Sequence, residues 1–140
     1  MSKLPPYADI PGTTIFDADM ARIGFPLNQF CMSLMSANNR TRFLAEERLY
    51  LDEWPMLAEQ KEAVLKRDYN AMLDLGGNIF FLAKIFATDG LTFQQIAALM
   101  TGMPARAYAD MMLAGGRSPA GNCYLAVPDG DHCLPTESAV

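Results

Sequence analysis

The side chains of this 140-residue chain that could support catalysis are few, and they form no familiar site. His132 is the only histidine, so a non-haem iron site of two histidines and one carboxylate cannot be assembled from this chain alone. Cys123 and Cys133 flank that histidine, whereas Cys31 is distant, and the spacing fits no standard zinc pattern. We therefore expect no metal site here and interpret the cluster around His132 as ordinary tail residues.

Nucleophilic and acid–base chemistry are equally poorly supported. Ser33 or Cys31 would need a neighbouring base, and nothing in the spacing places His132 near either of them. Asp52 and Glu53 could exchange protons, but such a pair beside a tryptophan is more typical of an exposed helix end. The two Gly-Gly pairs follow no strand and so match no phosphate-binding motif. We predict no catalytic residue in this chain, which suits a subunit, cap or interaction module better than a self-sufficient enzyme.

The composition is apolar for a chain of this length and narrows the classes of partner. Hydrophobic residues make up 51% of the sequence and charged residues 19%, which suggests a large core or an apolar surface that a partner covers. The net charge of −5 and the absence of a basic run disfavour nucleic acids and anionic membranes. The longest apolar runs, such as residues 79–83, are too short to span a membrane. An odd number of cysteines and no secretion signal favour the cytoplasm.

Helical periodicity and stop signals predict an all-α fold. We expect a single domain, residues 1–140, of about six or seven short helices, with a core over about 10–121, an extended N-terminal arm and an irregular tail over 122–140. The helical segments cover residues 16–25, 26–36, 38–54, 55–77, 78–90, 92–103 and 104–116. The segment 78–90 is apolar nearly all round and is predicted to be buried at the centre of the domain.

Particular residues are expected to begin these helices and to fill their buried faces. The predicted N-caps are Asp17, either Asn38 or Asn39, Asn78, and Thr92 in a capping box with Gln95. The predicted buried side chains are Leu27, Phe30, Cys31, Leu34 and Met35 in the second segment, and Phe43, Leu44, Leu49 and Leu51 in the third. The alternating charges around Glu46 and Glu47 indicate a solvated face with i,i+4 ion pairs.

Several long motifs together resemble a known family. The chain contains, in order, LNQFCMSLM, YLDEW, KRDYNAMLDLGGNIFFLAKIFATDG, MTGM and GGRSPAG. These resemble the small α subunit of protocatechuate 4,5-dioxygenases, a module that is similar to the C-terminal part of gallate dioxygenases. The resemblance spans about Ile10 to Gly121.

The resemblance implies a role in extradiol ring cleavage. In that family a β subunit binds Fe(II) through two histidines and one glutamate. It uses O2 to open 3,4-dihydroxybenzoate at the 4,5 bond, giving 4-carboxy-2-hydroxymuconate semialdehyde. The helical α subunit caps the β active site, generally in an α2β2 assembly. A chain without metal ligands and with excess apolar residues agrees with this role.

The resemblance also implies two substrate-pocket residues. In the family, an aromatic residue just after the turn that corresponds to Thr88–Gly90 approaches the bound ring, and here that position is Phe93; the alternative is a plain core residue. Tyr69 is the second, with a phenol that could hydrogen-bond substrate across the interface; the alternative is a tyrosine buried against the β subunit. Gln95 departs from the apolar or aromatic residue expected there, which puts the rim of the pocket, and with it the preferred substrate, in doubt.

Two alternatives to the protocatechuate assignment remain. The same lid could serve a gallate or 3-O-methylgallate dioxygenase. The chain could also be a non-catalytic helical adaptor that binds an unrelated protein through its apolar face.

Overall fold

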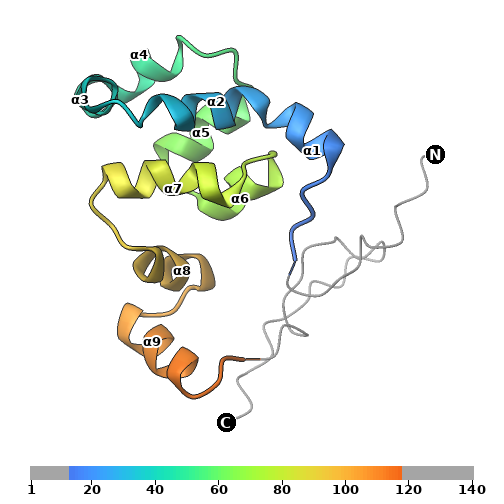
Figure 1. The fold of residues 1–140 in the computed structure, drawn as a ribbon, viewed down its shortest axis with the longest axis vertical. Coiled ribbons are helices and arrows are strands. Elements are labelled where there is room, and N and C mark those ends of the chain that lie inside the picture. Colours follow the sequence, from blue (N-terminus) through green and yellow to red (C-terminus); the bar gives the residue numbers. More distant parts are fainter. Residues whose placement is uncertain (1–12, 118–140) are drawn as a thin grey trace, which may run out of the picture. The chain divides into compact units, whose positions relative to one another are not determined.

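The computed structural model of the chain describes residues 13–117, and these are helical, with no β-strand among them. In order, the helices are α1 (Ala18–Ile23), α2 (Phe25–Ser33), α3 (Ala37–Ala45), α4 (Glu47–Leu51), α5 (Ala58–Leu65), α6 (Tyr69–Asp74), α7 (Ile79–Thr88), α8 (Phe93–Thr101) and α9 (Ala105–Leu113) (Figure 1). The all-α prediction is confirmed. The described range holds nine helices rather than six or seven, because two predicted helices are each divided into two.

The chain separates into two compact units, one of residues 16–109 and the other of residues 1–15 with 110–140. In the second unit, the described residues include the end of α9, where the amide N–H groups of Gly115 and Gly116 donate to Met112 and Met111 and end the helix as predicted. The predicted single domain stays a prediction. The predicted N-terminal arm and the tail with Cys123, His132 and Cys133 lie almost entirely outside the described residues. No helix within 13–117 is long and apolar enough to cross a membrane.

The predicted helix starts are confirmed where a short polar side chain accepts from the first turn. Asp17 accepts from the backbone N–H of Met20, and Asn78 accepts from that of Phe80. Thr92 and Gln95 form the predicted reciprocal capping box. These local signals fix where α1, α7 and α8 begin.

The predicted helix over residues 38–54 is instead two helices. α3 begins after Ser36, so the predicted Asn38 or Asn39 cap is wrong; Asn39 donates its side-chain amide to the carbonyl of Ser33. The backbone leaves helical geometry at Glu46, where φ is −146° and ψ is 79°. That break rotates α4 relative to α3 and changes which side chains face inward.

The consequence is a different buried set from the one predicted. Phe43 and Leu51 are fully buried as expected, but Leu44 is 48% and Leu49 62% exposed. Met35 is also exposed, because α2 ends at Ser33 and the predicted stripe stops at Leu34.

The charged side chains of α3 and α4 form ion pairs with later segments rather than along one helix. Arg42 pairs with Glu53, and Arg48 Nη2 lies 2.6 Å from Glu62 Oε1. The predicted i,i+4 pairs are absent from the ion pairs of the described residues, again because the helix is interrupted.

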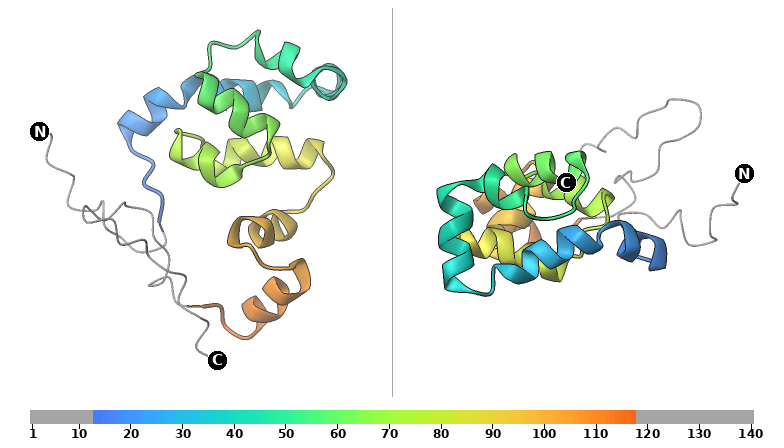
Figure 2. Two further views of the ribbon diagram at one scale, coloured as in Figure 1. Left: turned by 180° about the vertical axis from the view of Figure 1, so that it is seen from behind. Right: turned by 90° about the horizontal axis from the view of Figure 1, so that it is seen from above.

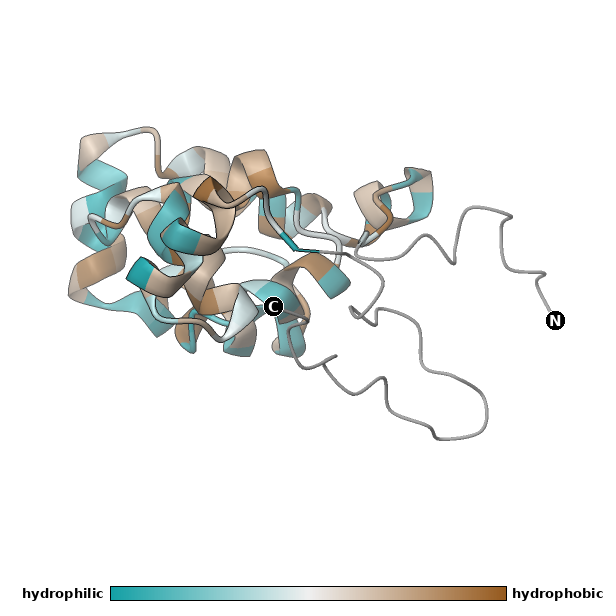
Figure 3. Cartoon of the chain, turned by 90° about the horizontal axis from the view of Figure 1, so that it is seen from below, coloured by the Kyte–Doolittle hydropathy of each residue, from teal (hydrophilic) through white to brown (hydrophobic). Residues whose placement is uncertain are grey.

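The core of residues 16–109 is built around α2 and α7, which lie side by side (Figures 1 and 2). Apolar and polar segments alternate along most helices in Figure 3, as expected of helices with one buried face. One aromatic cluster of the core is made by Phe30, Phe43, Tyr50 and Trp54, with neighbouring ring centroids 5.2–6.4 Å apart, mostly edge to face.

Close backbone contact and buried amides join the chain segments around α7. A Cβ on Gly24 would lie 1.8 Å from the carbonyl oxygen of Gly76, so the α1–α2 junction and the turn before α7 touch through glycine. The buried side chain of Asn28 donates to that same carbonyl and accepts from the backbone N–H of Asn78. Gln60, fully buried, donates to two further backbone carbonyls. The start of α7 is thus firmly held.

Candidate functional site

Phe93 is the first residue of α8, immediately after the Thr92 cap, and 60% of it is exposed. Its ring meets that of Phe86 edge to face, with centroids 6.0 Å apart and an interplanar angle of 74°. The side chain is therefore anchored on one side and open on the other. Such a ring is available to contact a molecule or protein outside this chain.

Tyr69, the first residue of α6, contacts the same Phe86 ring from within the core. Its ring centroid lies 5.9 Å from that of Phe86, again edge to face, and only 2% of the residue is exposed. Its hydroxyl is buried and has no hydrogen-bond partner among the described residues. Burial raises the pKa of this hydroxyl above its ordinary value, and the negative charge of Asp89 raises it further.

The structure thus joins the two predicted site residues through a third that sequence reasoning did not identify. We call Tyr69, Phe86 and Phe93 the aromatic line, since it runs from the core to the surface of residues 16–109. The sequence did contain a signal for Phe86. This residue lies seven positions before Phe93, near the end of an apolar helix, and it shares the inward face of that helix with Leu82 and Ile85.

An open apolar groove of about 250 Å3 lies beside Phe93. It is lined by Leu73, Ile79, Phe93, Ile96, Ala97, Met100 and Thr101. The one hydroxyl in this set, that of Thr101, donates to the carbonyl of Ala98. The groove offers no acid, base or nucleophile, so it can supply shape and apolar contact but not proton transfer.

The outer face of α7 carries exposed apolar side chains together with Lys84. Phe80 is 79% exposed, although the all-apolar pattern of this segment predicted burial. Leu82, Ile85 and Phe86 of α7 are buried, and Phe81 and Ala83 are half-buried against the same core, which leaves Phe80 and Ala87 exposed. Leu91 and Leu99, on the α7–α8 connection and α8, are exposed as well. Large apolar side chains that stay exposed are candidates for contact with a partner.

The other described side chains that were considered for chemistry, Cys31 and Ser33, are buried or hydrogen-bonded within the fold. Cys31 is buried in the core, and its burial raises the pKa of the thiol well above the ordinary value, so the nucleophilic thiolate is disfavoured. Ser33 donates to the carbonyl of Phe30 and shares a hydrogen bond with the hydroxyl of Tyr50. Within residues 13–117, no three histidine, cysteine or acidic side chains gather in a way that could hold a metal ion.

The Asp52–Glu53 pair does not form an acid–base site. Asp52 accepts from Lys61 at 3.1 Å, whereas Glu53 pairs with Arg42, and both carboxyl groups lie about half exposed on the surface. The two side chains therefore serve separate surface ion pairs.

Comparison with known proteins adds a family to this geometry. The model of the family described as "Aromatic-ring-opening dioxygenase LigAB, LigA subunit" matches residues 27–113, which include the whole aromatic line. A gallate dioxygenase of Pseudomonas putida is 27% identical over 93 residues. That alignment covers 66% of this chain and 27% of the gallate dioxygenase, so the chain spans about a quarter of that protein's length.

Proposed function

This chain belongs to the LigA-subunit family of aromatic-ring-opening dioxygenases, and on that premise we propose that it caps the active site of an iron-bearing β subunit that cleaves protocatechuate. The reaction would open 3,4-dihydroxybenzoate at the 4,5 bond with O2. We further propose that residues 1–140 act as one α-subunit domain with a core over about 10–121, in a cytoplasmic α2β2 complex.

The observation that carries this proposal is the apolar groove beside an exposed Phe93, whose lining offers no acid or base. A lid needs apolar shape and a firm scaffold rather than reactive groups. Excluding water around a bound catechol would protect oxygen intermediates from side reactions. The groove, the exposed Phe80 and the fixed start of α7 supply those properties.

Phe93 is the proposed pocket residue of this chain. Its exposed edge would pack against the substrate ring, and such aromatic pairs contribute about 0.5–1.5 kcal/mol beyond the area they bury. Tyr69 is proposed as the second pocket residue, acting from behind through Phe86. Because its hydroxyl is buried, a direct hydrogen bond to substrate would require α6 and α7 to rearrange when the complex forms.

The iron is proposed to be held entirely by the partner. Fe(II) dioxygenases of this kind use two histidines and one carboxylate, and no such donor set exists within residues 13–117. When bound in the β subunit, the iron would supply the oxygen chemistry. This chain's residues would position the ring and exclude water.

Co-expression of the chain with its iron-bearing partner tests the proposal. We expect the two to co-purify and the complex to cleave protocatechuate faster than the β subunit alone. Phe93→Ala should raise KM for protocatechuate about 2- to 10-fold, following the aromatic contribution above, with iron content unchanged. If the chain forms no complex and leaves ring cleavage unaffected, the lid role is refuted.

The runner-up function is the same lid in a gallate or 3-O-methylgallate dioxygenase, which the similarity to a gallate dioxygenase favours. Comparing kcat/KM for the three acids with the reconstituted complex decides between them. The third possibility, a non-catalytic adaptor, would be supported by stable binding to a protein that holds no iron.

A further inference from the structure

Arg67 occupies a strained position between α5 and α6. Its φ is +54°, the only positive value at a non-glycine residue among the described residues. An arginine in this left-handed conformation costs about 1–2 kcal/mol, and persists where its surroundings fix it. No glycine or proline marks this break in the sequence. The backbone N–H groups of Arg67 and Asp68 donate to the carbonyls of Val64 and Ala63 and close the end of α5. The side chain of Arg67 adds contacts that a glycine at this position could not make.

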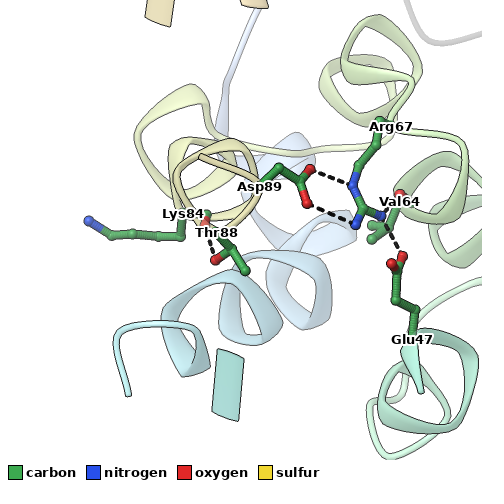
Figure 4. A network of polar contacts seen from close by, with 6 residues as sticks. All are labelled: Glu47, Val64, Arg67, Lys84, Thr88 and Asp89. Atoms are coloured by element: carbon green, nitrogen blue, oxygen red, sulfur yellow. Dashed lines mark hydrogen bonds and ion pairs between the residues drawn. The ribbon is translucent and has the colours of Figure 1, made fainter. Parts of the chain in front are cut away.

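Those contacts use four of the five guanidinium N–H donors (Figure 4). Nε and Nη2 donate to the two carboxylate oxygens of Asp89, at 2.7 and 3.2 Å. Nη1 donates to Glu47 Oε1 at 2.6 Å and to the carbonyl of Val64 at 2.8 Å. The guanidinium also lies over the ring of Phe43, 5.3 Å from its centroid.

The network is largely shielded from water. The side chains of Arg67, Asp89 and Glu47 are 21%, 20% and 29% exposed, whereas each other ion pair of the described residues has at least one side chain that is more than half exposed. Burial alone would lower the pKa of Arg67, but its hydrogen bonds to Asp89 and Glu47 raise it above the ordinary value. The guanidinium of Arg67 is therefore always charged. Its two parallel hydrogen bonds to Asp89 fix the orientation of the carboxylate as well as its distance.

Asp89 connects this network to Phe93. It is the C-cap of α7, and only Gly90, Leu91 and Thr92 separate it from Phe93. Gly90 adopts φ +78° and the N–H of Leu91 donates to the carbonyl of Phe86. The connection to α8 begins at Asp89, whose carboxylate is held by Arg67. The position of the first turn of α8 therefore depends on that contact.

Arg67 is connected to the other end of the aromatic line as well. Tyr69 follows it by two residues, and the backbone turn at Arg67 lets α6 begin where the Tyr69 ring meets Phe86. Arg67 thus influences both ring contacts of Phe86. Its backbone turn places Tyr69, and its side chain, through Asp89, places Phe93.

We propose that Arg67 is a positioning residue that sets the place and orientation of the Phe93 ring through the Asp89–Gly90 turn. The effect on substrate rests on the proposed function, in which Phe93 contacts the aromatic ring. The placement of Phe93 itself does not depend on that function.

The first test measures placement without catalysis. Phe93 is replaced by 4-fluorophenylalanine in the full chain, and its 19F resonance is compared in the parent, Arg67→Met and Arg48→Met chains. Arg48 is the matched control, since it forms an exposed pair with Glu62 away from α8. We expect the resonance to shift or broaden with Arg67→Met and to stay in place with Arg48→Met. A resonance unchanged by Arg67→Met in a folded chain overturns the proposal.

Asp89→Asn is the second variant, for use if Arg67→Met does not fold. It keeps the shape of the residue and removes the charge that the guanidinium holds. The same 19F change is expected, and its absence would contradict the proposal equally.

The second test uses the reconstituted complex and a double-mutant cycle. Arg67→Met should raise KM for 3,4-dihydroxybenzoate by no more than the about 2- to 10-fold expected for Phe93→Ala, since it displaces the ring that Phe93→Ala removes. In a Phe93→Ala background the same change should have little effect on KM, although the loss in Tm is retained. An undiminished KM effect in that background would overturn a route through Phe93.

The outcomes separate this proposal from the proposed function. A shifted 19F resonance with no kinetic effect of Phe93→Ala would support the positioning role of Arg67 and refute the substrate contact. A purely stabilising role would lower Tm without moving either the resonance or KM.

Discussion

Replacing Phe80 by alanine tests whether the outer face of α7 is covered by a partner. The residue is 79% exposed, so the isolated chain gains little from it, and we expect its Tm to stay nearly unchanged. Burying an exposed phenylalanine contributes about 1.5–3 kcal/mol, and scaling this by the open fraction gives about 1.2–2.4 kcal/mol. The Kd for the β subunit should therefore rise about 7- to 50-fold.

The assay is a titration of the β subunit with the parent and variant chains, together with thermal melts of each chain alone. Leu49→Ala is the matched control, because Leu49 is 62% exposed on α4, which packs against α3 and α5 rather than α7. We expect the control to change neither Kd nor Tm by a measurable amount.

Two results would refute this reasoning. An unchanged Kd for Phe80→Ala would mean that the outer face of α7 stays in solvent when the complex forms. An equal loss of affinity for the β subunit with Leu49→Ala would mean that binding does not depend specifically on the apolar surface of α7 and α8.

Three further predictions concern the scaffold of this site. Tyr69→Phe removes a buried hydroxyl without a partner, so the free energy of unfolding of the isolated chain should rise by about 1 kcal/mol. Because burial raises the pKa of Tyr69, the unfolded phenol ionises from about pH 10 while the folded one stays neutral. The stability that comes from keeping the phenol neutral is thus complete below about pH 10, and above that pH it falls by up to about 1.4 kcal/mol per pH unit. Tyr69→Phe should remove this loss, which urea titrations of both chains at pH 8 and pH 11 would measure. Gly24→Ala should destabilise by about 3 kcal/mol or more, since its Cβ would overlap the carbonyl of Gly76, and thermal denaturation measures this. Asn28→Ala should lose about 2–4 kcal/mol in the same assay, because the buried carbonyl of Gly76 and N–H of Asn78 lose their partner.

Matched controls make these effects specific. Tyr50→Phe removes a hydroxyl that is bonded to Ser33, so it should destabilise the chain where Tyr69→Phe stabilises it. Gly90→Ala has open space around its Cβ but a positive φ, so it should cost only about 1–2 kcal/mol. Equal effects of the two glycine variants would contradict the steric argument for Gly24.

The sequence predicted those parts of the fold that depend on local chemistry. Asp17, Asn78 and Thr92 each satisfy backbone N–H groups within three residues, so their signals can be seen in a short stretch of sequence. The break between α5 and α6 has a local signal too, which the sequence prediction missed, since Asp68 accepts from the backbone N–H of Ala71 and begins α6. The side-chain contacts of Arg67 at this break could not be predicted in this way. They are made with Asp89 and Glu47, which are 22 and 20 residues distant, and only the folded chain brings them together.

The candidate site shows the same division. The position of Phe93 after its cap could be expected from sequence, but its contact with Phe86 and the groove beside it depend on how α8 packs against α7. The expectation that α7 is buried was wrong for Phe80, because the apolar pattern shows that a surface is covered without showing which molecule covers it.

The polar interactions of residues 16–109 explain why the apolar surface of α7 and α8 can be presented in one fixed arrangement. Asn28 holds the start of α7 through the Gly76–Asn78 turn, and Arg67 holds its end through Asp89. Both anchors are buried or shielded, so their hydrogen bonds are costly to break. A helix fixed at both ends loses little conformational entropy when a partner covers its outer face. The buried polar groups of residues 16–109 thereby preorganise the apolar surface of α7 and α8, which is what the proposed lid over another subunit's active site would require.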